Sequence, residues 1–254
     1  LILIFLTFSF YPTYYEISQR YNLIDRNREF VLEHNFYWPD FNLYLSKIRQ
    51  GYEGSWTAVA RYTSEPHRGS LIQEFYIVLG HFGRILNTAP NYSYQLGRLI
   101  LSPILLVIIF LLCRKFFPSF AWQIAAFVIV IVSGSFPRFY SDTAGAIQIG
   151  RYMEWWSNID ALQRITLIPH ILFGQIISLA LLNLLVIKRF NNFSIKRLIL
   201  YIILGNLAGL VFPPSLITLD GSLILFLIVR LIKTRKNLFI GLLLARRSFS
   251  EGGV

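Results

Sequence analysis

The feature that most restricts the fold of this chain is a series of long apolar segments. Apolar residues fill 55% of the 254 positions and charged residues only 15%, whereas a soluble domain carries roughly 25% charged residues. A helix needs roughly 17–25 apolar residues to cross the hydrocarbon of a bilayer. Segments near this length are 96–113, 119–136, 169–187 and 216–232, with a shorter one at 198–212. They predict an all-α fold: a polytopic transmembrane helix bundle that forms one domain over 1–254.

Both ends of the sequence look like incomplete spans. Residues 1–10 and 238–245 are apolar but too short to cross a bilayer. No small-x-small cleavage pattern follows the first of them, which argues against a signal peptide. We therefore interpret the sequence as a fragment of a longer protein, with a truncated first span, about five further spans within 98–245, and a partial last one.

The net charge of +11 is unevenly distributed. Segment 11–97 holds eight Lys or Arg and eight Asp or Glu, and segment 137–168 holds three of each. The excess lies at Arg114, Lys115, Lys188, Arg189, Lys196, Arg197, Arg230, Lys233, Arg235, Lys236, Arg246 and Arg247. Short loops rich in Lys and Arg stay on the cytoplasmic side of a membrane. We therefore expect a multi-pass protein of the plasma (inner) membrane, with 11–97 and 137–168 as outer loops and no nucleic-acid partner.

Segment 70–86 is the ambiguous part of the first outer loop. Its apolar residues recur at helical spacing, beside Gln73, Glu74, His81 and Arg84. Ionisable groups in the middle of a span are costly in hydrocarbon, so we expect an amphipathic helix that lies in the outer interface. If the segment crossed the membrane instead, residues 11–69 would be cytoplasmic.

The first outer loop also carries a set of motifs in a fixed order. They are Pro39-Asp40-Phe41-Asn42-Leu43-Tyr44, Ile48-Arg49-Gln50-Gly51, Tyr62-Thr63-Ser64-Glu65-Pro66-His67 and Arg98. Over residues 36–117 this order resembles the first half of the GT-C membrane glycosyltransferases, similar to protein mannosyltransferases, lipid A aminoarabinose transferases and RgtA-like transferases. The chain departs from the family at Asp40-Phe41, where Asp-Glu is frequent, and at Pro66-His67-Arg68, where Pro-Pro-Leu is frequent.

This resemblance implies transfer of a sugar from a polyprenyl-phosphate donor to a glycan, lipid or protein acceptor on the extracytoplasmic face. It implies Asp40 as the loop carboxylate, with Tyr44 and Gly51 in the helix that follows. It places Glu65 before the interfacial helix and Arg98 at the head of the next span. Tyr44 and Glu65 are therefore expected to contact a substrate.

Asp40 is the expected general base, because the transfer needs a carboxylate that takes the proton of the acceptor. An aspartate directly after Pro39 would also serve as the cap of a helix that begins at Phe41, since Asp is favoured there. The two roles are compatible.

The donor phosphate requires cationic groups at the outer surface. Arg61, His67, Arg68 and Arg98 are the candidates, because a guanidinium matches phosphate oxygens in a bidentate manner. Each of them taken singly also fits a side chain that extends to the lipid headgroups.

The second outer loop, 137–168, is too long for a simple connection. Its Trp155 suits either a sugar platform or the aromatic belt that flanks membrane spans. Asp160 and His170 could reach Asp40 across a cavity, although Asp160 could instead pair with Arg164 four residues on.

The histidines show no metal-ligand spacing, and we expect no resident cofactor; a divalent ion between Asp40 and an acid of the second loop would be compatible with the chemistry. The alternative to an enzyme is a polytopic transporter or a non-catalytic envelope-assembly protein. In a transporter Asp220 would line a path, because a carboxylate within an apolar run is costly unless it has a function. We favour a helix cap at Asp220.

Overall fold

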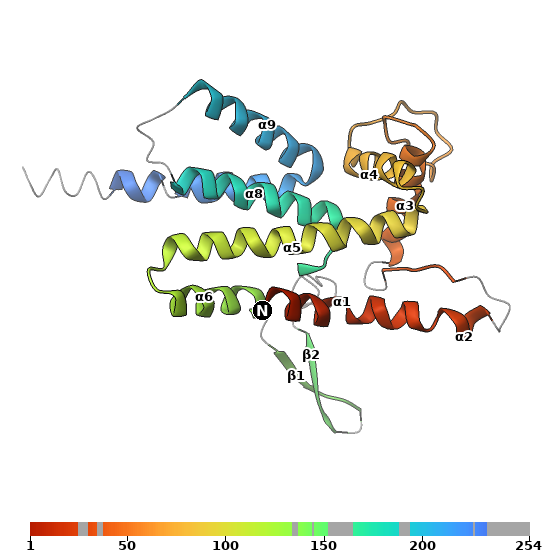
Figure 1. Ribbon diagram of the computed structural model, residues 1–254, viewed down its shortest axis with the longest axis horizontal. Coiled ribbons are helices and arrows are strands. Elements are labelled where there is room, and N and C mark those ends of the chain that lie inside the picture. Colours follow the sequence, from red (N-terminus) through yellow and green to blue (C-terminus); the bar gives the residue numbers. More distant parts are fainter. Residues whose placement is uncertain are drawn as a thin grey trace, which may run out of the picture.

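The computed structural model describes residues 1–24, 30–34, 38–133, 137–143, 145–151, 165–187, 194–225 and 227–232 of the protein (Figure 1). These residues are mostly helical, as the apolar segments predict. The helices are α1 (Ile2–Ser18), α2 (Arg20–Ile24), α3 (Trp38–Tyr52), α4 (Glu74–Ile85), α5 (Pro90–Phe116), α6 (Phe120–Val132), α8 (Pro169–Ile187), α9 (Ile195–Val211) and Pro213–Ile232. Strands β1 (Pro137–Ser141) and β2 (Ile147–Arg151) form an antiparallel hairpin.

Two helices of the described part are long and apolar enough to cross a membrane, α5 and Pro213–Ile232. Three further apolar helices are shorter: α6, the Pro169–Leu184 part of α8 and the Leu198–Val211 part of α9. The expected helix at 119–136 ends at Val132, and its 13 residues rise about 20 Å, less than the roughly 30 Å of a bilayer core. The sequence supplies the reason, since Ser133, Gly134 and Pro137 follow and disfavour helix.

Helices α5 and α8 lie side by side and run in the same direction (Figure 1). Near their starts, Nε of Arg98 donates a hydrogen bond of 2.8 Å to the carbonyl of Thr166. Near their ends, Nζ of Lys115 donates a hydrogen bond of 3.2 Å to the carbonyl of Asn183. The segment that connects α5 to α8 must therefore lead the chain back to the end where α5 begins.

Helix α9 runs antiparallel to α8, and the Pro213–Ile232 helix runs antiparallel to α9. A Cβ at Gly174, near the start of α8, would lie 2.5 Å from Cβ of Phe212, just after α9. A Cβ at Gly209 would lie 3.2 Å from Leu216, so the Pro213–Ile232 helix turns back against α9. The chain therefore makes a tight turn around the Pro213-Pro214 pair.

This packing gathers the basic ends of the helices. Arg114 and Lys115 lie in the last turn of α5, Lys196 lies at the start of α9, and Arg230 lies near the end of Pro213–Ile232. Because α5 and α8 are parallel and α9 is antiparallel to them, these positions share one end of the molecule, which we call the cationic end.

Helices α3 and α4 pack against each other at the opposite end, beside the start of α5 (Figure 1). We call this helix pair the platform. Two glycines bring the backbones together: a Cβ at Gly51 would lie 2.0 Å from the carbonyl oxygen of Ile77, and one at Gly80 would lie 2.1 Å from that of Ile48. The helix expected near 70–86 is thus α4, but it begins later, at Glu74.

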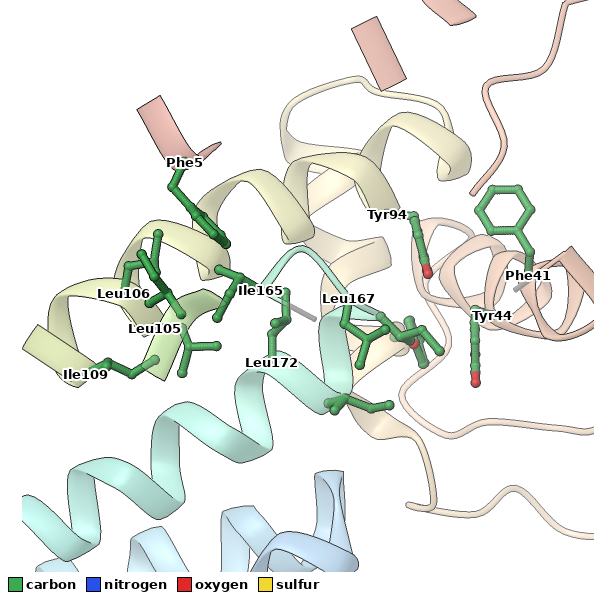
Figure 2. Close-up of a cluster of buried hydrophobic side chains, with 14 of the residues drawn as sticks. Phe5, Phe41, Tyr44, Tyr94, Leu105, Leu106, Ile109, Ile165, Leu167 and Leu172 are labelled. Carbon is green, nitrogen blue, oxygen red and sulfur yellow. The ribbon is translucent and has the colours of Figure 1, made fainter. Parts of the chain in front are cut away.

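The hydrophobic core runs along α5 and α8 and continues into the platform. Figure 2 shows Leu105, Leu106 and Ile109 of α5 against Leu172 of α8, with Phe5 of α1 beside them. Outside this core, large apolar side chains of α5, α6, α9 and Pro213–Ile232 are exposed. Exposed apolar side chains in such number indicate contact with lipid or another protein.

Candidate functional site

Three buried tyrosines join the platform to α5. Tyr44 of α3 and Tyr76 of α4 stack with ring centroids 4.6 Å apart and planes at 19°. Tyr94 of α5 stacks on Tyr44 at 6.3 Å and 13°, and Figure 2 shows these two rings nearly parallel and offset. We call the three residues the tyrosine cluster. Its stacked rings fix how α3, α4 and α5 meet.

Two histidines bind the hydroxyl groups of this cluster. Nδ1 of His170, at the start of α8, shares a hydrogen bond of 2.7 Å with the hydroxyl of Tyr76. Nδ1 of the buried His34 shares one of 2.9 Å with the hydroxyl of Tyr94. Burial raises the pKa of Tyr76 well above its usual value. Burial, and then the charge of Arg98, hold the pKa of His34 well below 6.5, so His34 and Tyr76 are both neutral at neutral pH.

Asp40 lies at the edge of the tyrosine cluster. It stands in the first turn of α3, which begins at Trp38 and not at Phe41, so Asp40 is inside the helix rather than its cap. Tyr44 follows one turn later on the same face. The Asp40 side chain is exposed, and its charge contributes to the raised pKa of Tyr76. No Lys, Arg or His of the described residues pairs with it at ion-pair distance.

Lys47 stands on this same face of α3, seven residues after Asp40. It is only 8% exposed, and its ammonium donates a hydrogen bond to Oε1 of Gln73, just before α4. Burial lowers the pKa of Lys47. The ammonium also interacts electrostatically with His170. The Asp40 carboxylate and the Lys47 ammonium thus share one face of the platform with the phenols of Tyr44 and Tyr76. The imidazole of His170, from α8, joins them there.

Arg98 forms hydrogen bonds inside the protein that stabilise its structure. Although expected at the head of a span, it lies inside α5, eight residues after Pro90, and is 4% exposed. Besides its bond to Thr166, it donates a hydrogen bond of 2.6 Å to Oε1 of Gln95, and its guanidinium lies over the ring of Phe10 at 5.3 Å. These contacts direct the side chain into the protein.

The other candidate phosphate ligands lie in the loop between α3 and α4. Arg61 donates to Glu53 at 3.2 Å, and Arg49 donates to the same carboxylate at 2.9 Å. These two hydrogen bonds, Arg49 first, lower the pKa of Glu53. Arg49 is nine residues after Asp40, so it faces the opposite side of α3. The structure therefore does not bring Arg61 together with Asp40.

His67, Glu65 and Arg68 belong to this same exposed loop. Nε2 of His67 accepts a hydrogen bond of 2.9 Å from the backbone N–H of Ala60, and its Nδ1 lies 3.0 Å from the carbonyl oxygen of Glu65. His67 thus holds the loop in shape. On the side of α3 opposite Asp40 lies an open cleft of about 660 Å³, and Arg49 and Arg61 are among the residues that line it.

Some candidates of the second outer loop lie outside the described residues, namely Trp155 and Asp160. His170 is described, and it reaches the tyrosine cluster. Asp220 is exposed within the Pro213–Ile232 helix, so the expected helix start at Asp220 is wrong. The helix begins at the proline pair because proline suits a first helical turn.

Within the described ranges, no three His, Cys, Asp or Glu side chains gather as a metal site requires. Sequence reasoning passed over Lys47, Tyr76 and Tyr94. The helical spacing of Asp40, Tyr44 and Lys47, at i, i+4 and i+7, was the available signal for Lys47.

Comparison with known proteins gives no relative. No family model matches the sequence, and neither a curated protein nor a solved structure matches it. The described structure defines a mostly helical protein, with two helices long enough for membrane spans and a platform that carries an exposed carboxylate.

Proposed function

We propose that this chain is part of a polytopic membrane glycosyltransferase similar to the GT-C class. It transfers a sugar from a polyprenyl-phosphate donor to a glycan, lipid or protein acceptor at the extracytoplasmic face, with Asp40 as general base. The observation that carries the proposal is the exposed Asp40 carboxylate at the edge of the tyrosine cluster, with no cation of the described residues paired to it.

The orientation follows from charge. Basic residues gather at the end of the helices away from the platform, and cytoplasmic loops carry the excess of Lys and Arg. The platform then faces outward, where lipid-linked sugars are the available donors. The exposed apolar surfaces of α5 and Pro213–Ile232 supply lipid contact.

The order of elements also supports the proposal. An apolar helix, α1, leads to two helices too short to span, α3 and α4, and then to the long apolar helix α5. The motifs that resemble the transferase family lie on the platform: Asp40 opens α3, and Gly51 near its end allows the close crossing with α4.

The chemistry requires a base that is ionised and reachable. A carboxylate held at the edge of an apolar surface can accept the proton of an acceptor hydroxyl or amine as the sugar is transferred, and such a group contributes roughly 10²–10⁴-fold to the rate. An exposed Asp40 can meet an acceptor that arrives from the aqueous side, while the apolar surfaces nearby keep a lipid-linked donor in the bilayer.

The test is sugar transfer by the full reading frame expressed in membranes, with polyprenyl-phosphate sugars as donors. Asp40→Asn keeps the size of the side chain and removes the base, so transfer should fall by roughly a hundredfold or more. Glu33→Gln removes another exposed acid of the first outer loop and is the matched control. Equal transfer by Asp40→Asn and Glu33→Gln, at equal protein levels, would remove Asp40 from the reaction. Absence of transfer by the unmodified protein from every donor would reject the enzyme.

A further inference from the structure

Lys47 is a buried charge with little compensation. An ammonium has three N–H donors, and Gln73 accepts one of them. No carboxylate of the described residues lies at ion-pair distance from Lys47. A charged group that is 8% exposed is costly unless an opposite charge accompanies it. The remaining donors therefore favour an anion.

Gln73, the partner of Lys47, is held in an unusual conformation. Its φ of 66° lies in the left-handed region, which is unfavourable for a residue with a Cβ. Neighbouring bonds fix this turn: the N–H of Ile72 donates to Oγ of Ser70 at 3.0 Å, and that of Glu74 donates to the carbonyl of Leu71 at 3.1 Å. Strained residues of this kind collect at ligand sites.

The surface next to Gln73 is apolar. Leu71 and Ile72 are 53% and 71% exposed, and they immediately precede Gln73 in the chain. A ligand that binds Lys47 and also covers these two side chains must combine an anionic group with a hydrocarbon chain.

We propose that Lys47, assisted by His170, binds the phosphate of a prenyl phosphate whose hydrocarbon chain lies over Leu71 and Ile72. The inference rests on the proposed function and names a residue for its donor. Asp40 precedes Lys47 by seven residues on the same face of α3, which separates them by about 10 Å along the axis. This spacing leaves room for a sugar between the phosphate and the base.

The arginines are poorer candidates for this task. The guanidinium of Arg98 donates to Thr166 and Gln95 inside the protein. Arg61 is paired with Glu53 on the side of α3 opposite Asp40.

The experiment measures binding, which does not depend on sugar transfer. The full chain in phosphatidylcholine nanodiscs is titrated with farnesyl phosphate, with farnesol as the neutral probe. Lys47→Met should weaken farnesyl phosphate binding tenfold or more, because it removes a charge-assisted hydrogen bond, and should leave farnesol binding unchanged. Lys47→Arg should restore part of the affinity. Lys115→Met, at the cationic end, is the matched control and should bind as the unmodified protein does.

A second variant covers the case in which Lys47→Met does not fold. Ile72 is largely exposed, so Ile72→Asp should keep the fold while placing a negative charge beside the phosphate, and it too should lose affinity tenfold or more. Unchanged binding by either folded variant, or equal binding of farnesol, would overturn the inference. Equal occupation of the site by phosphatidylglycerol headgroups, seen as full competition in phosphatidylglycerol nanodiscs, would overturn the assignment to a prenyl phosphate.

The two proposals fail in different ways. Lys47-dependent binding of farnesyl phosphate without sugar transfer would support this site and reject the enzyme. Sugar transfer with an unchanged KM for the donor in Lys47→Met would reject this site and keep the enzyme. Asp40→Asn should bind farnesyl phosphate normally in either case.

Discussion

Tyr76 and His170, 94 positions apart in the sequence, share a hydrogen bond of 2.7 Å that joins α4 to α8. The bond is enclosed, since Tyr76 is fully buried, and the Tyr44 ring stacks on Tyr76 and lies tilted against His170 with ring centroids 5.4 Å apart. It connects the platform to the helix that follows segment 137–168. The position of the platform against the apolar helices therefore depends on a hydrogen bond between two side chains far apart in the sequence.

Tyr76→Phe should destabilise the protein by about 1–3 kcal/mol, because it leaves a buried ring nitrogen of His170 without its partner. The stacking with Tyr44 is kept, since the ring remains. Thermal unfolding in detergent measures the effect. Tyr92→Phe, at an exposed tyrosine, is the control. Similar unfolding midpoints for Tyr76→Phe and Tyr92→Phe would show that the hydrogen bond contributes nothing.

Local patterns of the sequence predicted much of the fold. The apolar run at 96–113 lies within α5, and the helical spacing at 70–86 marks α4. The β1–β2 hairpin is not predicted, because the length and charge of segment 137–168 indicate a loop without indicating strands. The start of α5 is not predicted either. Its first turns, from Pro90, are polar and lack the apolar pattern of a span. Packing against the platform stabilises them.

The candidate site was predicted only in part. Asp40 and Tyr44 were found through motifs on one helix. The electrostatic interaction of Lys47 with His170 depends on where α8 begins relative to the platform, and no local pattern carries that information. The basic candidates Arg61 and Arg98 were chosen by residue type, whereas their hydrogen-bond partners decide what their charges do.

Gly51→Ala and Gly80→Ala should each separate α3 from α4, because the added Cβ would meet backbone atoms at 2.0 and 2.1 Å. Overpacking of this kind costs typically 1–3 kcal/mol, and more where the backbone must move. Gly205→Ala is the control, as it has open space around it within α9 and alanine favours a helix. Chemical or thermal unfolding compares the three. Equal stability of Gly51→Ala and Gly205→Ala would contradict the close crossing.

Arg98→Met should destabilise the protein by about 1–3 kcal/mol, because the carbonyl of Thr166 and Oε1 of Gln95 lose their donor. In the folded fraction, farnesyl phosphate binding should stay unchanged. Arg68→Met, at an exposed position, should alter neither quantity. Loss of phosphate binding without loss of stability in Arg98→Met would assign Arg98 to the ligand instead.

Acidification should destabilise the protein through His34. The pKa of folded His34 lies well below 6.5, so below that pH the unfolded chain binds more protons and stability falls. At pH 5 the unfolded pKa limits the loss from this residue to at most about 2 kcal/mol. His34→Gln should be less stable at neutral pH but show a weaker decline between pH 7.5 and 5. Parallel pH curves for the two proteins would show that His34 titrates normally in the folded state.

Single-cysteine variants test the orientation, with the native Cys113 changed to serine. Glu65→Cys should react with a membrane-impermeant maleimide on intact cells, because Glu65 lies in the exposed loop of the platform. Lys196→Cys should react only after the membrane is permeabilised, because the proposed orientation places the cationic end in the cytoplasm. The reverse pattern would invert the topology and exclude transfer at the outer face.

The parallel packing of α5 and α8 has an electrostatic result. Each helix carries a macrodipole equivalent to roughly half a positive charge at its first turn. Antiparallel neighbours would cancel these fields, but α5 and α8 point the same way, and both begin beside the platform. Their aligned fields add at the end where Asp40 and Lys47 lie. The first turns of these two helices therefore draw anions toward the platform before any side chain contributes.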